Sequence, residues 1–188
     1  MKMNRFHDLR DYRFTNGEKF IFDTNVWLYI FPPSPKSSSE TLRSKYMASL
    51  RAMRAAGARI YLDAFVLSEY LNRFARVKWE EHNRHQKQAV FHSYKTFRNS
   101  PYYGEVAVKT LTAAGKIAAY CERLDIMFTQ YDFERMLIDH SRAVCDFNDS
   151  VLIATCRYHD CKLITHDSDF AAVDYDLDVL THNATLFP

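Results

Sequence analysis

The chain has 188 residues, 47% hydrophobic and 15% aromatic, which is enough for one well-filled core and too little for two comfortable domains. No stretch is long enough for a transmembrane helix, the first residues lack an apolar signal core, and the four cysteines lack the CxxC pairs of a zinc site. The net charge of +2 hides an asymmetry, because cations dominate up to residue 120 and acids dominate after it. We therefore expect one reduced, cytoplasmic domain without a membrane segment.

The first strong pattern is KFIFDTNVWLYIF over residues 19–31. An apolar run of strand type stops at Asp23, and the WLYIF that follows suits a helix packing back on a sheet. Thr24 and Asn25 add oxygen atoms beside that carboxylate and could cap the helix. The alternative is that these three polar residues form only a turn and a cap.

Residues 32–39 are rich in proline and serine and are predicted to form an exposed loop. Ser37 and Glu40 have the spacing of a capping box, so the next helix is expected to run from there to Ala56, closed by a glycine.

A second strand is predicted over residues 59–62, followed by a helix over residues 64–79 with an apolar stripe. Glu69 lies in the first turns of this helix. A glutamate there can also be explained by its favourable interaction with the helix dipole alone.

Residues 73–98 combine an excess of basic residues with interleaved aromatic ones. Such a composition suits a nucleic-acid backbone with unstacked bases. It equally suits a long solvated helix, or an interface for a second copy or an inhibitory protein. The basic residues predicted to bind nucleic acid are Arg73, Arg76, Lys78, Arg84 and Lys87.

The next segments are less sharply patterned. Residues 102–104 are predicted to be a turn, residues 106–122 a helix and residues 124–128 a third strand. Asp132 or its neighbours could cap a short helix ending near His140.

Residues 146–170 combine acids with a buried helix and a strand. The run VLIATC is apolar on every side, which predicts a helix inside the core, and Asp149 lies in its first turn. Asp146 is either the N-cap of that helix or an additional acid facing a metal, and the spacing favours the cap.

A short strand over residues 162–165 leads into a loop with Asp167 and Asp169, and residues 177–180 are predicted to be a last strand at the sheet edge. His166 in this loop is expected to be exposed. The alternation of strands and helices predicts an α/β fold, a three-layer α/β/α Rossmann-like arrangement around a central parallel sheet.

Acids therefore follow strands or begin helices at four places, where an open parallel sheet places its ligands. Clustered carboxylates repel one another, so a fold that gathers them normally supplies a cation. Ligation by oxygen alone selects Mg²⁺ or Mn²⁺ over zinc.

The chain resembles the PIN-domain ribonucleases, a family that includes many bacterial toxins, in four motifs taken in order. The motifs are FDTNVWL, LSEYL, NDSVLIATC and LITHDSDF, which together span residues 20–170. The resemblance implies that the catalytic acids are Asp23, Glu69, Asp149 and Asp167. It also implies metal ligation by Asp23, Asp149, Asp167 and the further carboxylate Asp169. Thr24, Asn25 and Asp146 are the expected accessory groups.

The resemblance implies a single PIN-like domain over residues 1–188. The chain departs from the small toxins of the family in two places, an N-terminal extension over residues 1–18 and a helical insertion over residues 76–105. The implied function is an endoribonuclease dependent on one or two Mg²⁺ or Mn²⁺ ions, as the toxin of a toxin–antitoxin pair. Its implied partners are RNA, an antitoxin or inhibitory protein, and a second copy in a homodimer.

Three alternatives belong to other classes. The chain could be a PIN-fold module that binds RNA or protein without catalysis, or a nuclease acting on DNA. A haloacid-dehalogenase phosphatase also places an aspartate after its first strand, but it needs a second one two residues on, where this chain has Asn25.

Overall fold

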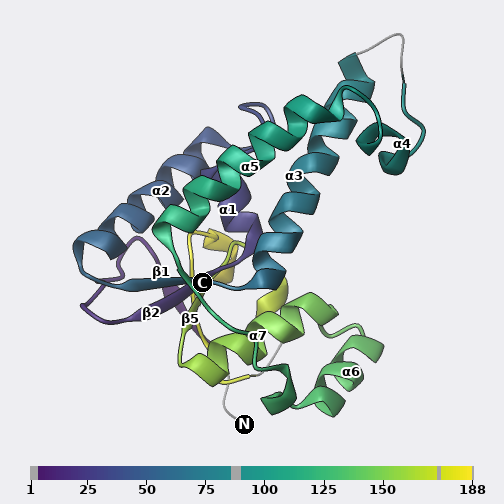
Figure 1. Ribbon diagram of the computed structural model, residues 1–188. Coiled ribbons are helices and arrows are strands. Elements are labelled where there is room, and N and C mark those ends of the chain that lie inside the picture. The colour runs from purple at the N-terminus through teal and green to yellow at the C-terminus, as the bar shows by residue number, and fades with distance from the viewer. Residues whose placement is uncertain (1–3, 86–89, 173–174, 188) are drawn as a thin grey trace.

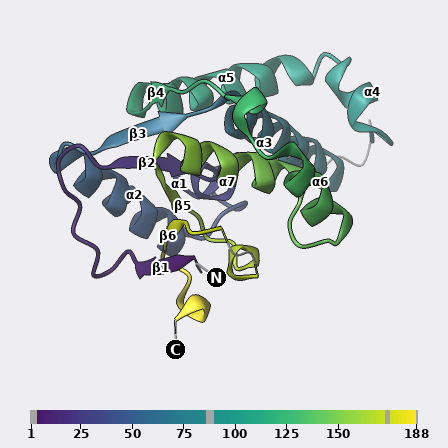
Figure 2. The same cartoon turned by 90° about the horizontal axis from the view of Figure 1, so that it is seen from below.

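The computed structural model describes residues 4–85, 90–172 and 175–187. Within these ranges six parallel strands form one sheet, in the order β1-β6-β5-β2-β3-β4. The strands are β1 (Arg5–Asp8), β2 (Lys19–Phe22), β3 (Arg59–Leu62), β4 (Glu122–Arg123), β5 (Lys162–Ile164) and β6 (Asp178–Thr181). Figure 2 shows the strands side by side, with β1 at one edge.

Helices cover both faces of this sheet, which confirms the predicted three-layer α/β/α fold. Figure 1 shows α1, α2, α3 and α5 on one side of the strands and α6 and α7 on the other. The helices are α1 (Thr24–Ile30), α2 (Glu40–Ala55), α3 (Ala64–His85), α4 (Tyr94–Arg98), α5 (Tyr103–Tyr120), α6 (Phe133–Ser141) and α7 (Phe147–His159). Single 3₁₀ turns occupy Phe128–Gln130, Asp169–Ala171 and Ala184–Leu186. Among the described residues, none of the helices combines the length and the apolar character needed to cross a membrane.

The core lies on both sides of β2 and β5. Phe20, Ile21 and Phe22 are fully buried because helices cover both faces of their strand. The apolar run of α7 is also buried, as its sequence predicts, and it packs beside β5. This packing fixes where α7 begins, and so where Asp149 lies.

A second, smaller apolar cluster holds α3, α4 and α5 together beyond the sheet. It is centred on the buried residues Ala75, Phe97 and Val106. The helix predicted over residues 64–79 runs on to His85, and this cluster packs against its second half at the buried Ala75 and the partly buried Trp79. Figure 1 shows α3 and α5 projecting from the sheet with α4 near their far ends.

The sheet edge differs from the prediction. The strand that was predicted at the sheet edge is β6, and it lies inside the sheet because β1 pairs with it. In this pairing Arg5 lies opposite Asp178, and Asp8 lies opposite Thr181. The segment predicted as a polar N-terminal extension therefore contributes the true edge. Its charged side chains suit that place, since Arg5 bonds the Asp178 carboxylate at 2.8 Å.

Several local boundaries also differ. Ser39, and not Ser37, caps α2 by accepting a hydrogen bond from the Leu42 amide, while the Ser37 hydroxyl closes a turn with Ser34. The predicted turn at residues 102–104 is mostly the first turn of α5.

The third strand is also shorter and earlier than predicted. Only Glu122 and Arg123 form β4, although the Leu124 amide still bonds the Leu62 carbonyl. The short helix capped by Asp132 is confirmed, because its carboxylate accepts from the Arg135 amide and α6 ends at Ser141.

Candidate active site

Carboxylates from four separate segments lie at the edge where the strands end. Asp23 directly follows β2 and precedes α1, Glu69 is in the second turn of α3, Asp149 is in the first turn of α7, and Asp167 follows β5. The charges of Glu69 and Asp167 raise the pKa values of both Asp23 and Asp149, and the charge of Asp23 also raises that of Asp149. The four acids are therefore electrostatic neighbours, as parallel strand ends and helix starts predict.

Asp23 is the most deeply placed of these acids, with 8% of its surface exposed. Its Oδ2 accepts hydrogen bonds from Asn25 Nδ2 at 2.6 Å and from Thr165 Oγ1 at 2.6 Å. Burial raises the pKa of Asp23 to about 6, helped by the charges of Glu69 and Asp167 and opposed by the Thr165 hydrogen bond.

Asp149 is partly buried and interacts electrostatically with four other acids. Burial comes first among the causes that raise its pKa to about 7, followed by the charges of Asp146, Asp23, Asp167 and Glu69. Asp146 caps α7, because its Oδ1 accepts a hydrogen bond from the Asp149 amide at 2.8 Å. The cap interpretation is confirmed, and the cap also adds negative charge beside the site.

Glu69 is held at the border between α1 and α3. Its Oε2 accepts a hydrogen bond from Thr24 Oγ1 at 3.2 Å, and its Oε1 lies 3.7 Å from Arg73 Nη1. Two of the predicted accessory residues, Thr24 and Asn25, therefore bond directly to predicted catalytic acids.

The loop after β5 positions Asp167. The Asp167 amide donates to Thr165 Oγ1 at 3.0 Å, and Asp167 Oδ1 accepts from the Asp169 amide at 2.9 Å. Asp169 itself is exposed at the start of a 3₁₀ turn. The loop is tied to α1 because the His166 amide donates to Asn25 Oδ1 at 3.2 Å.

His166 is half-buried, which corrects the expectation that it is exposed. Its Nδ1 lies 2.9 Å from the Tyr46 hydroxyl, and its ring packs edge-on against Tyr46 and Tyr29. Burial lowers its pKa. The histidine thus anchors the Asp167 loop to α2.

Two residues near the acids were not predicted. Thr165 bonds Asp23, Asn25 and the Asp167 amide through one hydroxyl. Asp63 follows β3 as Asp23 follows β2, is 2% exposed, and lines the same small recess as Asp23 and Asp149. An acid directly after a predicted strand was a signal for Asp63, whereas the sequence holds none for Thr165.

Asp63 caps α3, because its Oδ1 accepts from the Val66 amide at 2.9 Å. Its Oδ2 is buried and has no hydrogen-bond partner among the described residues. Burial raises its pKa. This carboxylate therefore sets the start of the helix that carries Glu69.

Within the described ranges, no three acidic, histidine or cysteine side chains stand close enough together to enclose one metal ion. The chemistry of the donors nevertheless fits magnesium or manganese, since every acid in the recess offers only carboxylate oxygen. Burial first, and then the neighbouring carboxylates, raise the pKa values of Asp23 and Asp149, and a bound cation would lower both values.

The predicted nucleic-acid-binding residues do not share one location. Arg73 lies beside Glu69, whereas the Arg76 guanidinium packs over the Tyr94 ring and Lys78, 16% exposed, pairs with Glu81 at 2.9 Å. Arg84 is exposed near the far end of α3, and Lys87 lies outside the described residues. Since a helix rises about 1.5 Å per residue, Arg76, Lys78 and Arg84 lie progressively farther along α3 from Glu69.

Comparison with known proteins places this arrangement in a family. The family model of the PIN domain matches residues 20–175. Among solved structures, the crystal structure of VapBC2 from Rickettsia felis bound to a DNA fragment from their promoter is similar, with a TM-score of 0.53. That match has 13% sequence identity and covers 87% of this chain and 98% of that chain, so it supports the fold. No curated protein matches the chain.

Proposed function

The chain belongs to the PIN domain family, and from this premise we propose that it is a metal-dependent endoribonuclease that hydrolyses RNA phosphodiester bonds. One observation carries the proposal. Four carboxylates from separate segments of the chain lie at the carboxyl edge of the sheet, where burial and then the charges of neighbouring acids raise the pKa values of Asp23 and Asp149. Acids that repel one another in this way are typical of a site that binds a cation.

We assign the metal ligands to Asp23, Asp149 and Asp167, with Glu69 at the border of the site and Asp169 as an accessory carboxylate. The ion is Mg²⁺ or Mn²⁺, which when bound activates water and neutralises negative charge on the phosphate. The protein's own part is to orient these oxygens. Asn25 and Thr165 fix Asp23, and Thr24 fixes Glu69.

Phosphate must approach this acidic recess against its negative charge. Arg73 is the cation best placed to attract it, since its guanidinium lies at the rim beside Glu69 and is exposed. We propose that the more distant Arg76, Lys78, Arg84 and Lys87 contribute to the same electrostatic attraction at longer range.

A toxin of the toxin–antitoxin type is the context that we propose for this nuclease. The support is the structural similarity to the Rickettsia felis VapBC2 complex. An antitoxin or inhibitory protein and a second copy of the chain are then its proposed partners, in the cytoplasm. We interpret residues 1–18 as an extension and residues 76–105 as a helical insertion of one domain.

The test is cleavage of a panel of single-stranded RNA, structured RNA and DNA, with Mg²⁺, with Mn²⁺ and with chelator. Asp23→Asn serves as the inactive variant, and Asp125→Asn serves as the matched control because Asp125 is exposed and does not line the recess that holds Asp23 and Asp149. Metal-dependent cleavage of RNA that only the first variant loses supports the proposal. Cleavage of DNA alone would reassign the substrate, and cleavage of neither by protein free of bound inhibitor would contradict the enzyme.

A further inference from the structure

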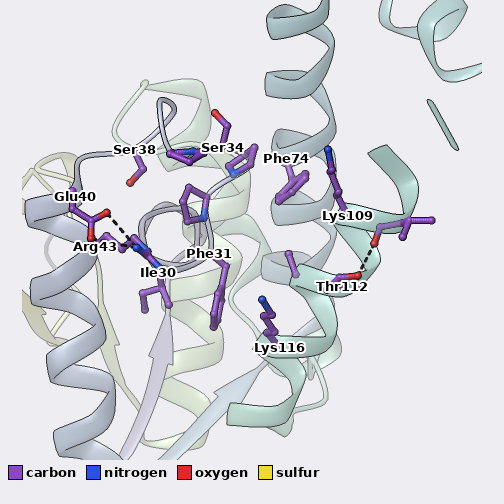
Figure 3. Close-up of a pocket in the computed structure, with 15 residues that line it drawn as sticks. Ile30, Phe31, Ser34, Ser38, Glu40, Arg43, Phe74, Lys109, Thr112 and Lys116 are labelled. Atoms are coloured by element: carbon purple, nitrogen blue, oxygen red, sulfur yellow. Dashed lines mark hydrogen bonds and ion pairs between the residues drawn. The ribbon is translucent and has the colours of Figure 1, made fainter. Parts of the chain in front are cut away.

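A pocket of about 420 Å³ opens between α1, α2, α3 and α5, apart from the carboxylates. It lies at the far end of α1, where Ile30 and Phe31 line it, whereas Asp23 precedes the first turn of that helix. Figure 3 shows its lining residues converging from the four helices and from the loop after α1. Its volume is in the range of small-molecule sites, roughly 300–1,000 Å³.

The wall of the pocket is largely apolar and firmly held. Phe31 packs parallel to the buried Trp27 with ring centroids 6.3 Å apart, and its carbonyl accepts a hydrogen bond from Tyr70 Oη at 2.7 Å. Prolines with fixed φ angles stiffen the loop. The apolar lining comprises Ile30, Phe31, Pro32, Pro33, Pro35, Phe74, Val108 and Ala113.

The charged groups around this wall are mostly positive. Arg43 lies 3.2 Å from Glu40 at the pocket, and Lys109 pairs with Glu105. In the described parts of the chain, no ion pair or hydrogen bond involves the Lys116 ammonium, which Figure 3 shows directed toward the pocket. Lys116 is thus a cation available beside an apolar wall.

A second polar group of the lining lacks a partner. Ser38 Oγ is buried, and it has no hydrogen-bond partner among the residues that the structure describes. Buried hydroxyls are normally hydrogen-bonded, and one left open beside a pocket can donate to a bound anion.

We propose that this pocket binds a small amphipathic anion, whose apolar or aromatic body lies against Phe31 and Phe74 and whose carboxylate or phosphate meets Lys116. Both halves of this ligand match the lining. Apolar area supplies affinity, and a charge-assisted hydrogen bond to the ammonium supplies orientation. Binding in this pocket requires neither the carboxylates of the acidic recess nor a metal ion.

The probe is anilinonaphthalene sulfonate, an aromatic anion whose fluorescence rises in apolar sites. It is titrated into the full chain with chelator present, so that no metal can hold a phosphate at the acids. Decanoate and adenosine monophosphate are then used as competitors. Displacement by the first assigns an alkyl carboxylate, and displacement by the second assigns a nucleotide phosphate.

Lys116→Glu is expected to weaken probe binding about tenfold, the effect of losing one charge-assisted contact. Lys95→Glu, an equal charge change on the exposed face of α4, should leave binding unchanged. Thr112→Trp fills the pocket from an exposed position of α5 and should abolish binding while the circular dichroism stays that of the parent. Parent-like binding of the probe by both Lys116→Glu and Thr112→Trp would overturn the proposal.

Discussion

The Thr165 hydroxyl donates a hydrogen bond to Asp23 Oδ2 at 2.6 Å, joining the end of β5 to the acid that follows β2. The same hydroxyl accepts from the Asp167 amide. One neutral side chain thus sets the positions of two predicted metal ligands, and it opposes the rise in the pKa of Asp23 that burial causes.

Thr165→Val should therefore raise the pKa of Asp23 above its value of about 6, because the hydrogen bond favours the ionised carboxylate. Carbon-detected NMR titration of the carboxyl group measures this directly. Thr112→Val, which removes an exposed hydroxyl bonded only to its own helix, is the control. An unchanged or lower pKa in the Thr165 variant would show that the bond does not act on Asp23.

Asp149→Asn should stabilise the metal-free protein at neutral pH. The folded pKa of Asp149 is about 7 against an ordinary value of 3.8, so the folded state holds its proton more tightly than the unfolded state. The contribution of Asp149 to the parent's free energy of unfolding therefore falls as pH rises from about 4 to about 7, and this contribution is absent from the variant.

The free energy of unfolding of Asp149→Asn should exceed that of the parent by on the order of 1 kcal/mol at pH 8 and by close to zero at pH 4. The value at pH 8 is discounted because Asp149 is partly exposed. Urea unfolding with chelator present, at both pH values, measures it. Asp125→Asn should show no such difference. A variant less stable than the parent at pH 8 would mean that the folded state stabilises the ionised Asp149 carboxylate.

Asp63→Ala should destabilise the fold by about 1–2 kcal/mol, because α3 loses its N-terminal cap. Asp63→Asn keeps a capping oxygen and should lose much less. Urea unfolding at pH 7 compares the two. Equal losses would assign the effect to the second, buried oxygen of this carboxylate and not to the cap.

Arg73→Gln should weaken RNA binding and reduce the salt slope of log affinity by about 0.7, the value for one phosphate contact with a single strand. Arg84→Gln, at the far end of α3, should have a smaller effect on both. Filter binding at several salt concentrations, with an uncleavable RNA, gives both quantities. Equal effects of the two substitutions would place the RNA along the whole of α3.

The sequence allows the fold and the places of the four acids to be predicted, because strand ends and helix starts are local patterns and parallel sheets bring them to one edge. Thr165 could not be found in this way. Its bond to Asp23 joins residues 142 positions apart and depends on strand register. For the same reason β1 was missed, since its pairing with β6 is non-local and its side chains are half solvated.

The basic residues illustrate a different limit. Composition counts cations but does not show which are already paired, and Lys78 is both paired with Glu81 and largely buried. The assignment of Asp23, Glu69, Asp149 and Asp167 to catalysis stays a prediction.

Titration of Mn²⁺ into the full chain, followed by electron paramagnetic resonance of the free ion, tests the central claim most directly. The parent should bind one or two ions, and Asp149→Asn should bind at least about tenfold more weakly, as expected when a metal ligand is lost. Asp125→Asn should bind as the parent does. Equal Mn²⁺ affinity in the parent and in folded Asp149→Asn would contradict a metal site at these carboxylates.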